Sequence, residues 1–211
     1  MRSGLQFICD TEANVVLVSE IPMASLSITV PVPTVIPSEL PKPIEISPPN
    51  ILIDLSGLYE IPHLLVPIDL SNAGNIIGNR YVAQISSTHS TLFNFDIPTE
   101  YQGKTCNLVF HVPPESQEWW HPWHLTTPGG IIFSKLKVPA TAISSSDSVS
   151  SSSSGPIGAV NSLESGGYLV NSAPCEAGKK LGYRADALGA TDLQYFQMTS
   201  PVAGLFMTVS G

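Results

Sequence analysis

Residues 91–112, TLFNFDIPTEYQGKTCNLVFHV, decide the fold class of this 211-residue chain. Apolar side chains fall at every second position near both ends of the stretch, a period that is typical of strands with one buried face. The residues on these two apolar faces are Phe93, Phe95, Ile97, Cys106, Leu108, Phe110 and Val112. Gly103 and Lys104 mark a turn between the two halves. The pattern predicts two adjacent antiparallel strands.

Further strands are predicted on both sides of this stretch. In residues 79–87, Tyr81, Ala83 and Ile85 fall on one face. Five more segments follow: GIIFSKLKV (130–138), YLVNS (168–172), KLGYRADA (180–187), LQYFQM (193–198) and GLFMTV (204–209). Gly, Pro and Asp separate these segments, and no crossover helix pattern lies between them. The sequence therefore predicts an all-β protein, an antiparallel β-sandwich.

Composition divides the chain into two parts. Residues 21–49 contain eight prolines, so we expect residues 1–50 to form an N-terminal strand and a Pro-rich arm. Residues 51–211 are expected to form a single β-sandwich domain. Within it, nine of the eleven residues from 144 to 154 are serine, and such a tract has little apolar area to offset its ordering entropy. Residues 144–156 are therefore predicted to be a flexible, surface-exposed insertion.

Charge and hydropathy exclude several classes of partner. The net charge of −8 works against binding to nucleic acid, whose backbone is also negative. No apolar run approaches the roughly 18 residues that a membrane-spanning helix needs. The first twenty residues lack the long apolar core of a secretion signal, because Cys9, Asp10 and Glu12 interrupt it. This last observation keeps a cytoplasmic location open as the alternative to an extracellular one.

Residues 118–124, EWWHPWH, contain all three tryptophans of the chain and two of its five histidines. Exposed indole rings stack on sugar rings, and neighbouring imidazoles can bind sugar hydroxyls. The alternative is that the tryptophans anchor a loop to the core. A metal site is not predicted, because the Pro-broken segment lacks a helix that would align its histidines. The ligand-binding candidates are Trp119, Trp120, Trp123, His121 and His124.

No catalytic residue and no cofactor are predicted. The chain has no Gly-X-Ser-X-Gly elbow, and its serines are concentrated in the tract that we expect to be flexible. A Gly-rich phosphate loop is also missing from the sequence. Four acidic residues, Asp54, Glu60, Asp69 and Asp96, follow no recognisable spacing for acid and base catalysis. An enzyme is therefore not expected.

Three cysteines, Cys9, Cys106 and Cys175, leave one without a partner if a disulfide forms. A bridge between Cys106 and Cys175 would close a loop of 175 − 106 = 69 residues around the Ser-rich tract. Alternatively, Cys106 is an ordinary small core residue and all the thiols are free. The alternation of the strand alone leaves both readings open.

Several blocks of the sequence together resemble the C-terminal domain of the fungal But proteins, a family catalogued as a ubiquitin-activating-enzyme binding domain. The blocks are IPHLLVPID (61–69), LFNFDIP (92–98), GKTCNLVFHVP (103–113), APCEAGKKLGYRAD (173–186) and LQYFQMTSPVAGLFMTV (193–209). The resemblance implies an all-β, mostly secreted or cell-surface domain in which Cys106 and Cys175 are paired. It carries over no catalytic residue. The family name itself implies an intracellular association with the activating enzyme of a ubiquitin-like modifier.

Three functional hypotheses follow. The first is a non-catalytic, cell-surface or wall-associated protein with a binding or structural role, whose partner is a wall polysaccharide or glycoprotein. The alternative is an intracellular protein-interaction module that binds the activating enzyme of a ubiquitin-like modifier. The third and least favoured is a metal-dependent enzyme at residues 118–124.

Overall fold

The structure is a computed structural model that describes residues 55, 57–115 and 122–211. The Pro-rich arm predicted for residues 1–50 lies outside the described residues. Within them the strands are β1 (Tyr59–Glu60), β2 (Leu64–Asp69), β3 (Val82–Ile85), β4 (His89–Asp96), β5 (Thr105–Val112), β6 (Trp123–Thr127), β7 (Gly130–Leu136), β8 (Ser153–Val160), β9 (Gly166–Pro174), β10 (Lys180–Leu188), β11 (Asp192–Phe196), β12 (Met198–Thr199) and β13 (Val202–Ser210). The helical segments are the 3-10 helix η1 (Thr99–Tyr101) and the helix α1 (Ser146–Val149).

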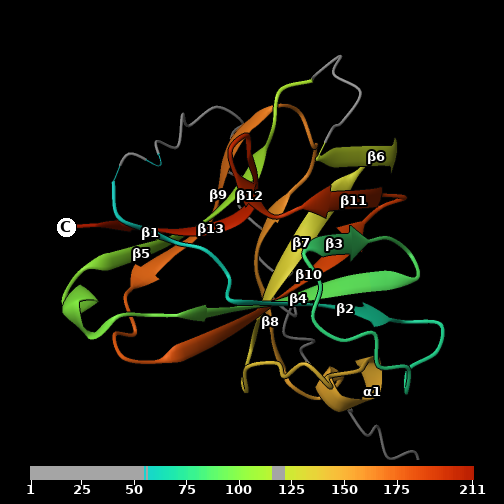
Figure 1. The fold of residues 1–211 in the computed structure, drawn as a ribbon, viewed down its shortest axis with the longest axis horizontal. Coiled ribbons are helices and arrows are strands. Elements are labelled where there is room, and N and C mark those ends of the chain that lie inside the picture. The colour runs from blue at the N-terminus through green and yellow to red at the C-terminus, as the bar shows by residue number, and fades with distance from the viewer. Residues whose placement is uncertain (1–54, 56, 116–121) are drawn as a thin grey trace, which may run out of the picture. The chain divides into compact units, whose positions relative to one another are not determined.

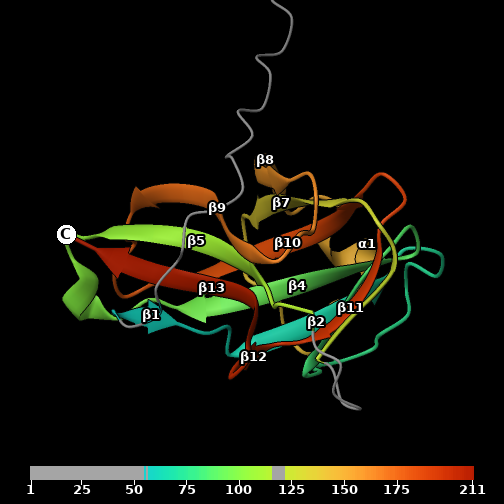
Figure 2. The same cartoon turned by 90° about the horizontal axis from the view of Figure 1, so that it is seen from above.

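The strands form three antiparallel sheets (Figures 1 and 2). One large sheet has the order β1-β13-β5-β9, with β12 also paired to β13, and the other has the order β2-β4-β10-β7-β8. A smaller sheet has the order β3-β11-β6. This arrangement confirms the predicted all-β antiparallel fold. In the described residues, no helix has the length and apolar character needed to cross a membrane.

A single main core lies between the inner faces of the three sheets. Phe93 and Phe95 of β4, Phe110 of β5 and Phe133 of β7 are all fully buried in it. The Phe110 and Phe133 rings pack 5.6 Å apart, which joins the two large sheets directly. Tyr195 of the small sheet packs edge-on against Phe110 at 5.7 Å. Aromatic side chains from three sheets thus share one hydrophobic core.

The predicted pairing of the two strands in residues 91–112 is wrong. Strand β4 pairs with β2 and β10, whereas β5 pairs with β13 and β9 in the opposite sheet. Between them, η1 and a turn at Gly103, with φ of 79°, carry the chain from one sheet to the other. The two apolar faces were predicted correctly, but they meet across the core and not along a shared ladder.

The Ser-rich segment is not the wholly exposed connection that we expected. It contains α1, whose first turn is held by a capping box between Ser145 and Ser148, and it runs into β8. Val149 and Ser145 are buried. Val149 packs with Leu92, on the outer face of the β2-β4-β10-β7-β8 sheet, in a second small core. The buried Val149 and the capping box therefore give this tract an ordered structure, although most of its residues are serine.

Asn94 also departs from the simple alternation of β4. Its side chain is 1% exposed and bonds to the backbone of Ala140, in the segment that leads to α1. The Asn94 amide donates to the Ala140 carbonyl at 2.7 Å and accepts from the Ala140 N–H at 3.0 Å. A polar position of the strand pattern is therefore buried, because the chain folds back over the outer face of this sheet.

Candidate functional site

The tryptophan-rich segment EWWHPWH divides between described and undescribed residues. Trp119, Trp120 and His121 lie outside the described residues. Trp123 begins β6, and its ring packs against the main core, stacked on Tyr195 with ring centroids 5.3 Å apart. It also contacts Phe110, with centroids 5.8 Å apart. Trp123 therefore fits the core-anchor interpretation, and the segment after Pro122 is a strand and not a loop.

His124, the next residue, lies on the opposite face of β6 and is exposed. Across the small sheet, Gln194 of β11 is directly opposite His124 on one side and Gln84 of β3 on the other. Gln194 is exposed between the buried Leu193 and Tyr195. The three strands thus present a row of two amides and one imidazole to solvent.

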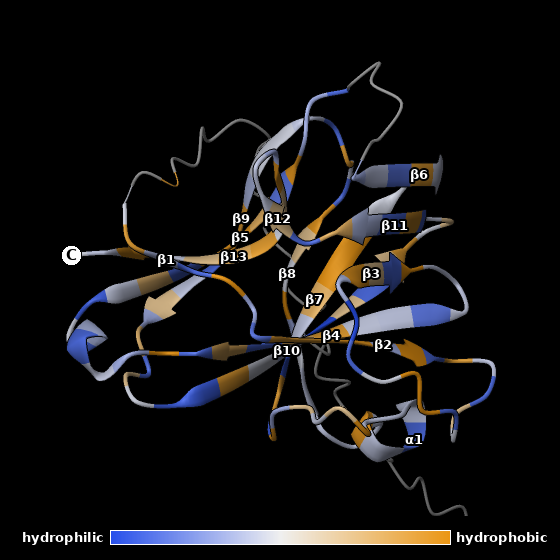
Figure 3. Cartoon of the chain, in the orientation of Figure 1, coloured by the Kyte–Doolittle hydropathy of each residue, from blue (hydrophilic) through white to orange (hydrophobic). Residues whose placement is uncertain are grey.

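Two exposed aromatic residues lie beyond the same side of this row. Phe196 follows Gln194 by two positions on the same face and is 39% exposed. Tyr81, directly before β3, is 84% exposed, although the alternation of residues 81–85 predicted a buried position for it. We call the surface formed by Tyr81, Gln84, His124, Gln194 and Phe196 the amide face. Figure 3 shows the mixed hydropathy of β6 and β11, in contrast to the strongly hydrophobic β7.

A shallow groove of about 270 Å³ adjoins the amide face. Ile61 and Met198 supply its apolar lining, and Ile61 is 51% exposed. Gln197, which also lines it, donates its backbone N–H to the Tyr81 carbonyl at 3.2 Å. The groove and the amide face therefore form one continuous surface that combines exposed apolar groups with hydrogen-bonding amides.

Side-chain hydrogen bonds hold the small sheet in position. The Thr91 hydroxyl of β4 accepts from the Gln84 N–H at 2.9 Å and donates to the Gln84 carbonyl at 2.7 Å. The Gln197 amide bonds both backbone groups of Leu205 in β13 at 2.9 Å. At Gly204, whose φ is +107°, an added Cβ would lie 2.3 Å from this amide. Strand β3 and the end of β11 are thereby fixed to the large sheets.

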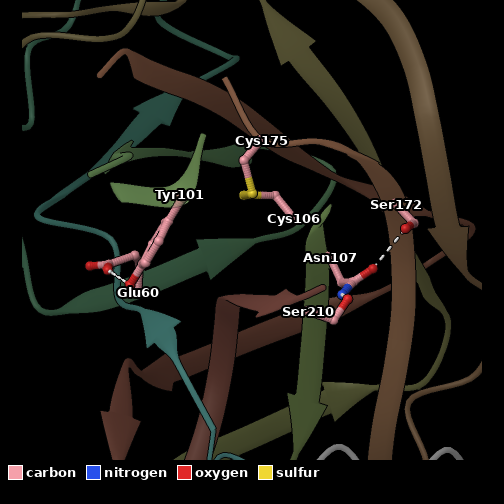
Figure 4. The surroundings of a disulfide bond; sticks show 7 residues. All are labelled: Glu60, Tyr101, Cys106, Asn107, Ser172, Cys175 and Ser210. Atoms are coloured by element: carbon pink, nitrogen blue, oxygen red, sulfur yellow. Dashed lines mark hydrogen bonds between the residues drawn. A yellow bond between two sulfur atoms is a disulfide. The ribbon is translucent and has the colours of Figure 1, made fainter. Parts of the chain in front are cut away.

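The structure contains a disulfide between Cys106 of β5 and Cys175, with the Cα atoms 4.8 Å apart (Figure 4). This is the pairing that the resemblance implies. Next to it on β5, the Asn107 amide accepts a hydrogen bond from Ser172 of β9 at 2.7 Å and donates one to Ser210 of β13 at 3.2 Å. The disulfide and Asn107 together fix β5 to its neighbours at one end of the sandwich.

The remaining candidates for chemistry are dispersed. The pKa of Asp69 is lowered to about 2, chiefly by hydrogen bonds from Ser71 and Asn75. This carboxylate therefore stabilises the turn that follows β2. Glu60 accepts a hydrogen bond from Tyr101 at 2.7 Å, and Asp96 pairs with His63 at 2.9 Å. Asp54 lies outside the described residues. Among the residues that the structure describes, no group of three His, Cys, Asp or Glu side chains converges as metal ligands would.

A family model described as "Ubiquitin 3 binding protein But2 C-terminal domain" matches residues 60–201. The chain belongs to the But2 C-terminal domain family. The match covers the strands from the end of β1 to β12 and stops before β13, so it includes the amide face and the disulfide. A search of curated proteins finds no match. The But2 description names binding as the property of the family, and it names no reaction.

Sequence reasoning selected His124 but missed the other residues of the amide face. Gln194 and Phe196 alternate with the buried Leu193 and Tyr195, so the outward positions of LQYF carried a signal. Gln84 carries the same signal, because it lies between the buried residues Ala83 and Ile85. What the sequence could not supply was the pairing of β11 with both β3 and β6.

Proposed function

We propose that this But2 domain is a non-catalytic binding protein of the cell surface or wall, and that the amide face binds carbohydrate. The observation that carries the proposal is the row of Gln84, Gln194 and His124, with the exposed residues Tyr81 and Phe196 beyond one side of it. Trp119, Trp120 and His121 lie outside the described residues and remain ligand-binding candidates from the sequence.

The chemistry of the row suits sugar hydroxyls. Each glutamine amide offers two donors and an acceptor, and an imidazole offers one of each when neutral. Hydroxyl groups of a polysaccharide need both donors and acceptors, whereas an apolar ring face needs a flat partner such as Tyr81. The sheet holds these groups on a rigid backbone, so little conformational entropy is lost when a chain of sugars binds.

The disulfide supports the location. Disulfides persist in oxidising compartments and are rare in the cytosol, where thiols are kept reduced. The bond between Cys106 and Cys175 therefore favours a protein that folds on the secretory route or functions outside the cell. Acidic net charge and serines exposed on the Ser-rich segment, such as Ser151 and Ser154, are consistent with a wall environment.

The direct test is retention of the full chain by insoluble chitin and β-glucan. We expect the wild-type protein to bind at least one of them. The Gln194→Ala and Tyr81→Ala variants should each bind at least about fivefold more weakly, because each loses a hydrogen bond or a stacking contact.

Matched controls are exposed residues that do not belong to the amide face. Gln102 is an exposed glutamine at the end of η1, and Ile143 is an exposed apolar residue before α1. Gln102→Ala and Ile143→Ala should bind as the wild type does. Equal retention of all four variants, or no retention of the wild type by any wall polysaccharide, would exclude the amide face as a carbohydrate site.

The second candidate is an intracellular module that binds the activating enzyme of a ubiquitin-like modifier, and the But2 family description favours it. The two candidates differ in the state of the cysteines. In protein from the native source, alkylation and intact mass should find one free thiol before reduction and three after it. Three free thiols at the outset, together with recovery of such an enzyme from cytosol, would favour the second candidate.

A further inference from the structure

A separate cavity of about 140 Å³ lies between the two large sheets, beside the disulfide. Cys106 and Leu108 of β5 and Met207 of β13 line it from one sheet, and Leu181 and Tyr183 of β10 line it from the other. These side chains are buried and belong to the main core. The core therefore contains a space with largely apolar walls, at a distance in the fold from the amide face.

Besides the charged pair Lys135 and Glu176, two polar side chains line this cavity: Asn171, whose amide donates to the Ile157 carbonyl at 3.3 Å, and Tyr183. Tyr183 is 6% exposed, and its ring packs edge-on against Phe95 at 5.9 Å. Within the described residues, its hydroxyl has no hydrogen-bond partner. Burial, together with the nearby charge of Glu176, raises the pKa of Tyr183 to about 12. At neutral pH the Tyr183 hydroxyl is thus protonated and is an unused hydrogen-bond donor in the cavity.

Charged groups at the rim are already paired. Lys135 of β7 forms an ion pair with Glu176, the residue after Cys175, and Lys179 contacts the same carboxylate at 3.0 Å. The hydrogen bond from Lys135, followed by that from Lys179, lowers the pKa of Glu176. A charged ligand would lose its hydration on entering an apolar space and find no unpaired partner there. The site therefore favours a neutral ligand.

The size of the cavity limits the ligand to a single ring or a short chain. An engineered apolar cavity of about 150 Å³ in another protein accepts benzene. We propose that the cavity beside the disulfide binds a small neutral amphiphile: an aromatic ring or short alkyl chain of about six to ten heavy atoms that carries one oxygen. The apolar part contacts Leu108, Leu181 and Met207, and the oxygen accepts a hydrogen bond from Tyr183.

Two probes of the same shape test this proposal. Acetophenone has a carbonyl oxygen where α-methylstyrene has a methylene group, so they differ chiefly in the hydrogen bond that they can accept. With the full chain, titration followed by amide chemical shifts should place acetophenone beside β10 and the disulfide. Because one hydrogen bond is at stake, α-methylstyrene should bind about threefold to tenfold more weakly.

Tyr183→Phe should remove this difference between the probes, leaving α-methylstyrene binding unchanged. The variant should fold normally, because the lost hydroxyl bonds to no described residue. Tyr195→Phe, which removes a buried hydroxyl in the same core, is the matched control and should leave both affinities unchanged. Ile157, half-buried at the cavity, offers a blocking variant, and Ile157→Phe should abolish binding of both probes.

Three results would overturn the proposal. They are the absence of shifts with either probe, equal affinity of the wild type for both probes, and a Tyr183→Phe variant that retains the preference for acetophenone. Retention by wall polysaccharides is measured separately and concerns a different surface, so the two proposals succeed or fail independently.

Discussion

At the scale of single residues, Tyr195 combines tight packing with an unsatisfied polar atom. Its ring stacks on Trp123, but its fully buried hydroxyl has no hydrogen-bond partner in the described structure. Burial raises the pKa of this hydroxyl far above its usual value. We predict that Tyr195→Phe increases the free energy of unfolding by about 1–2 kcal/mol, because the desolvation penalty disappears and the ring contacts remain. Urea denaturation measures the change, and a loss of stability would contradict it.

His111 should make stability depend on pH. It is half-buried in β5, and its Nδ1 is 3.0 Å from the Val202 carbonyl. Desolvation lowers the pKa of His111 below its ordinary value of 6.5, and the bond to Val202 opposes this only in part. The unfolded chain therefore binds the proton more readily than the folded one. The contribution of neutral His111 to the free energy of unfolding is therefore intact above about pH 6.5 and is lost as the pH falls below that value.

The measurement is the free energy of unfolding between pH 8 and pH 5, a range chosen to span the ordinary His pKa of about 6.5. We expect the wild type to lose stability toward pH 5 more steeply than His111→Gln, which cannot be protonated. Parallel pH profiles for the two proteins would show that other groups cause the loss.

At the scale of elements, the segment from β7 to β8 is held to the sheet by Asn94. We predict that Asn94→Ala lowers the free energy of unfolding by about 2–4 kcal/mol, since it leaves the buried N–H and carbonyl of Ala140 without partners. Asn107→Ala is the matched control, because Asn107 also bridges neighbouring elements but at an exposed position, and should cost about 1 kcal/mol or less. Similar losses in both variants would contradict the prediction.

The positions of most strands could be predicted from the sequence, but their pairing could not. Period-two alternation located β4, β5 and most later strands, because one buried face is a local property of a strand. The pairing of β4 with β10 is not local: Ser90 and Asp186, which contact each other across these strands, are 96 residues apart in the sequence. Gly103 indicates a turn, but it does not indicate which sheet the next strand joins. The prediction that the Ser-rich segment is flexible rested on its serine content and did not take account of the apolar Val149, which is buried.

The candidate site was predictable only in part for the same reason. His124 was selected because it is adjacent to tryptophans, not because the sequence placed it beside Gln194. Trp123 was selected with it, although successive residues of a strand face opposite sides and only one of the two can be outward. Once residues 122–127 are known to be a strand, this alternation separates the core residue from the surface residue.

At the scale of the whole molecule, the disulfide closes a loop of 69 residues that contains α1 and the four strands from β6 to β9. In the chain-entropy model such a loop contributes about 4 kcal/mol, mainly by restricting the unfolded chain. We predict that reduction, or replacement of Cys106 and Cys175 by Ala, lowers the free energy of unfolding by about that amount. Urea denaturation with and without reductant measures it, and unchanged midpoints would contradict it.

The contact between the two large sheets at Gly158 bears on how the protein behaves in concentrated solution. There, β8 of one sheet runs against β9 of the other so closely that an added Cβ would lie 2.0 Å from the Val170 carbonyl. The Asn171 amide also bonds to the Ile157 carbonyl at 3.3 Å across this boundary. Exposed strand edges recruit strands from other molecules and start aggregation. On this side of the sandwich, each sheet shields the edge of the other, so a foreign strand finds no open ladder to extend.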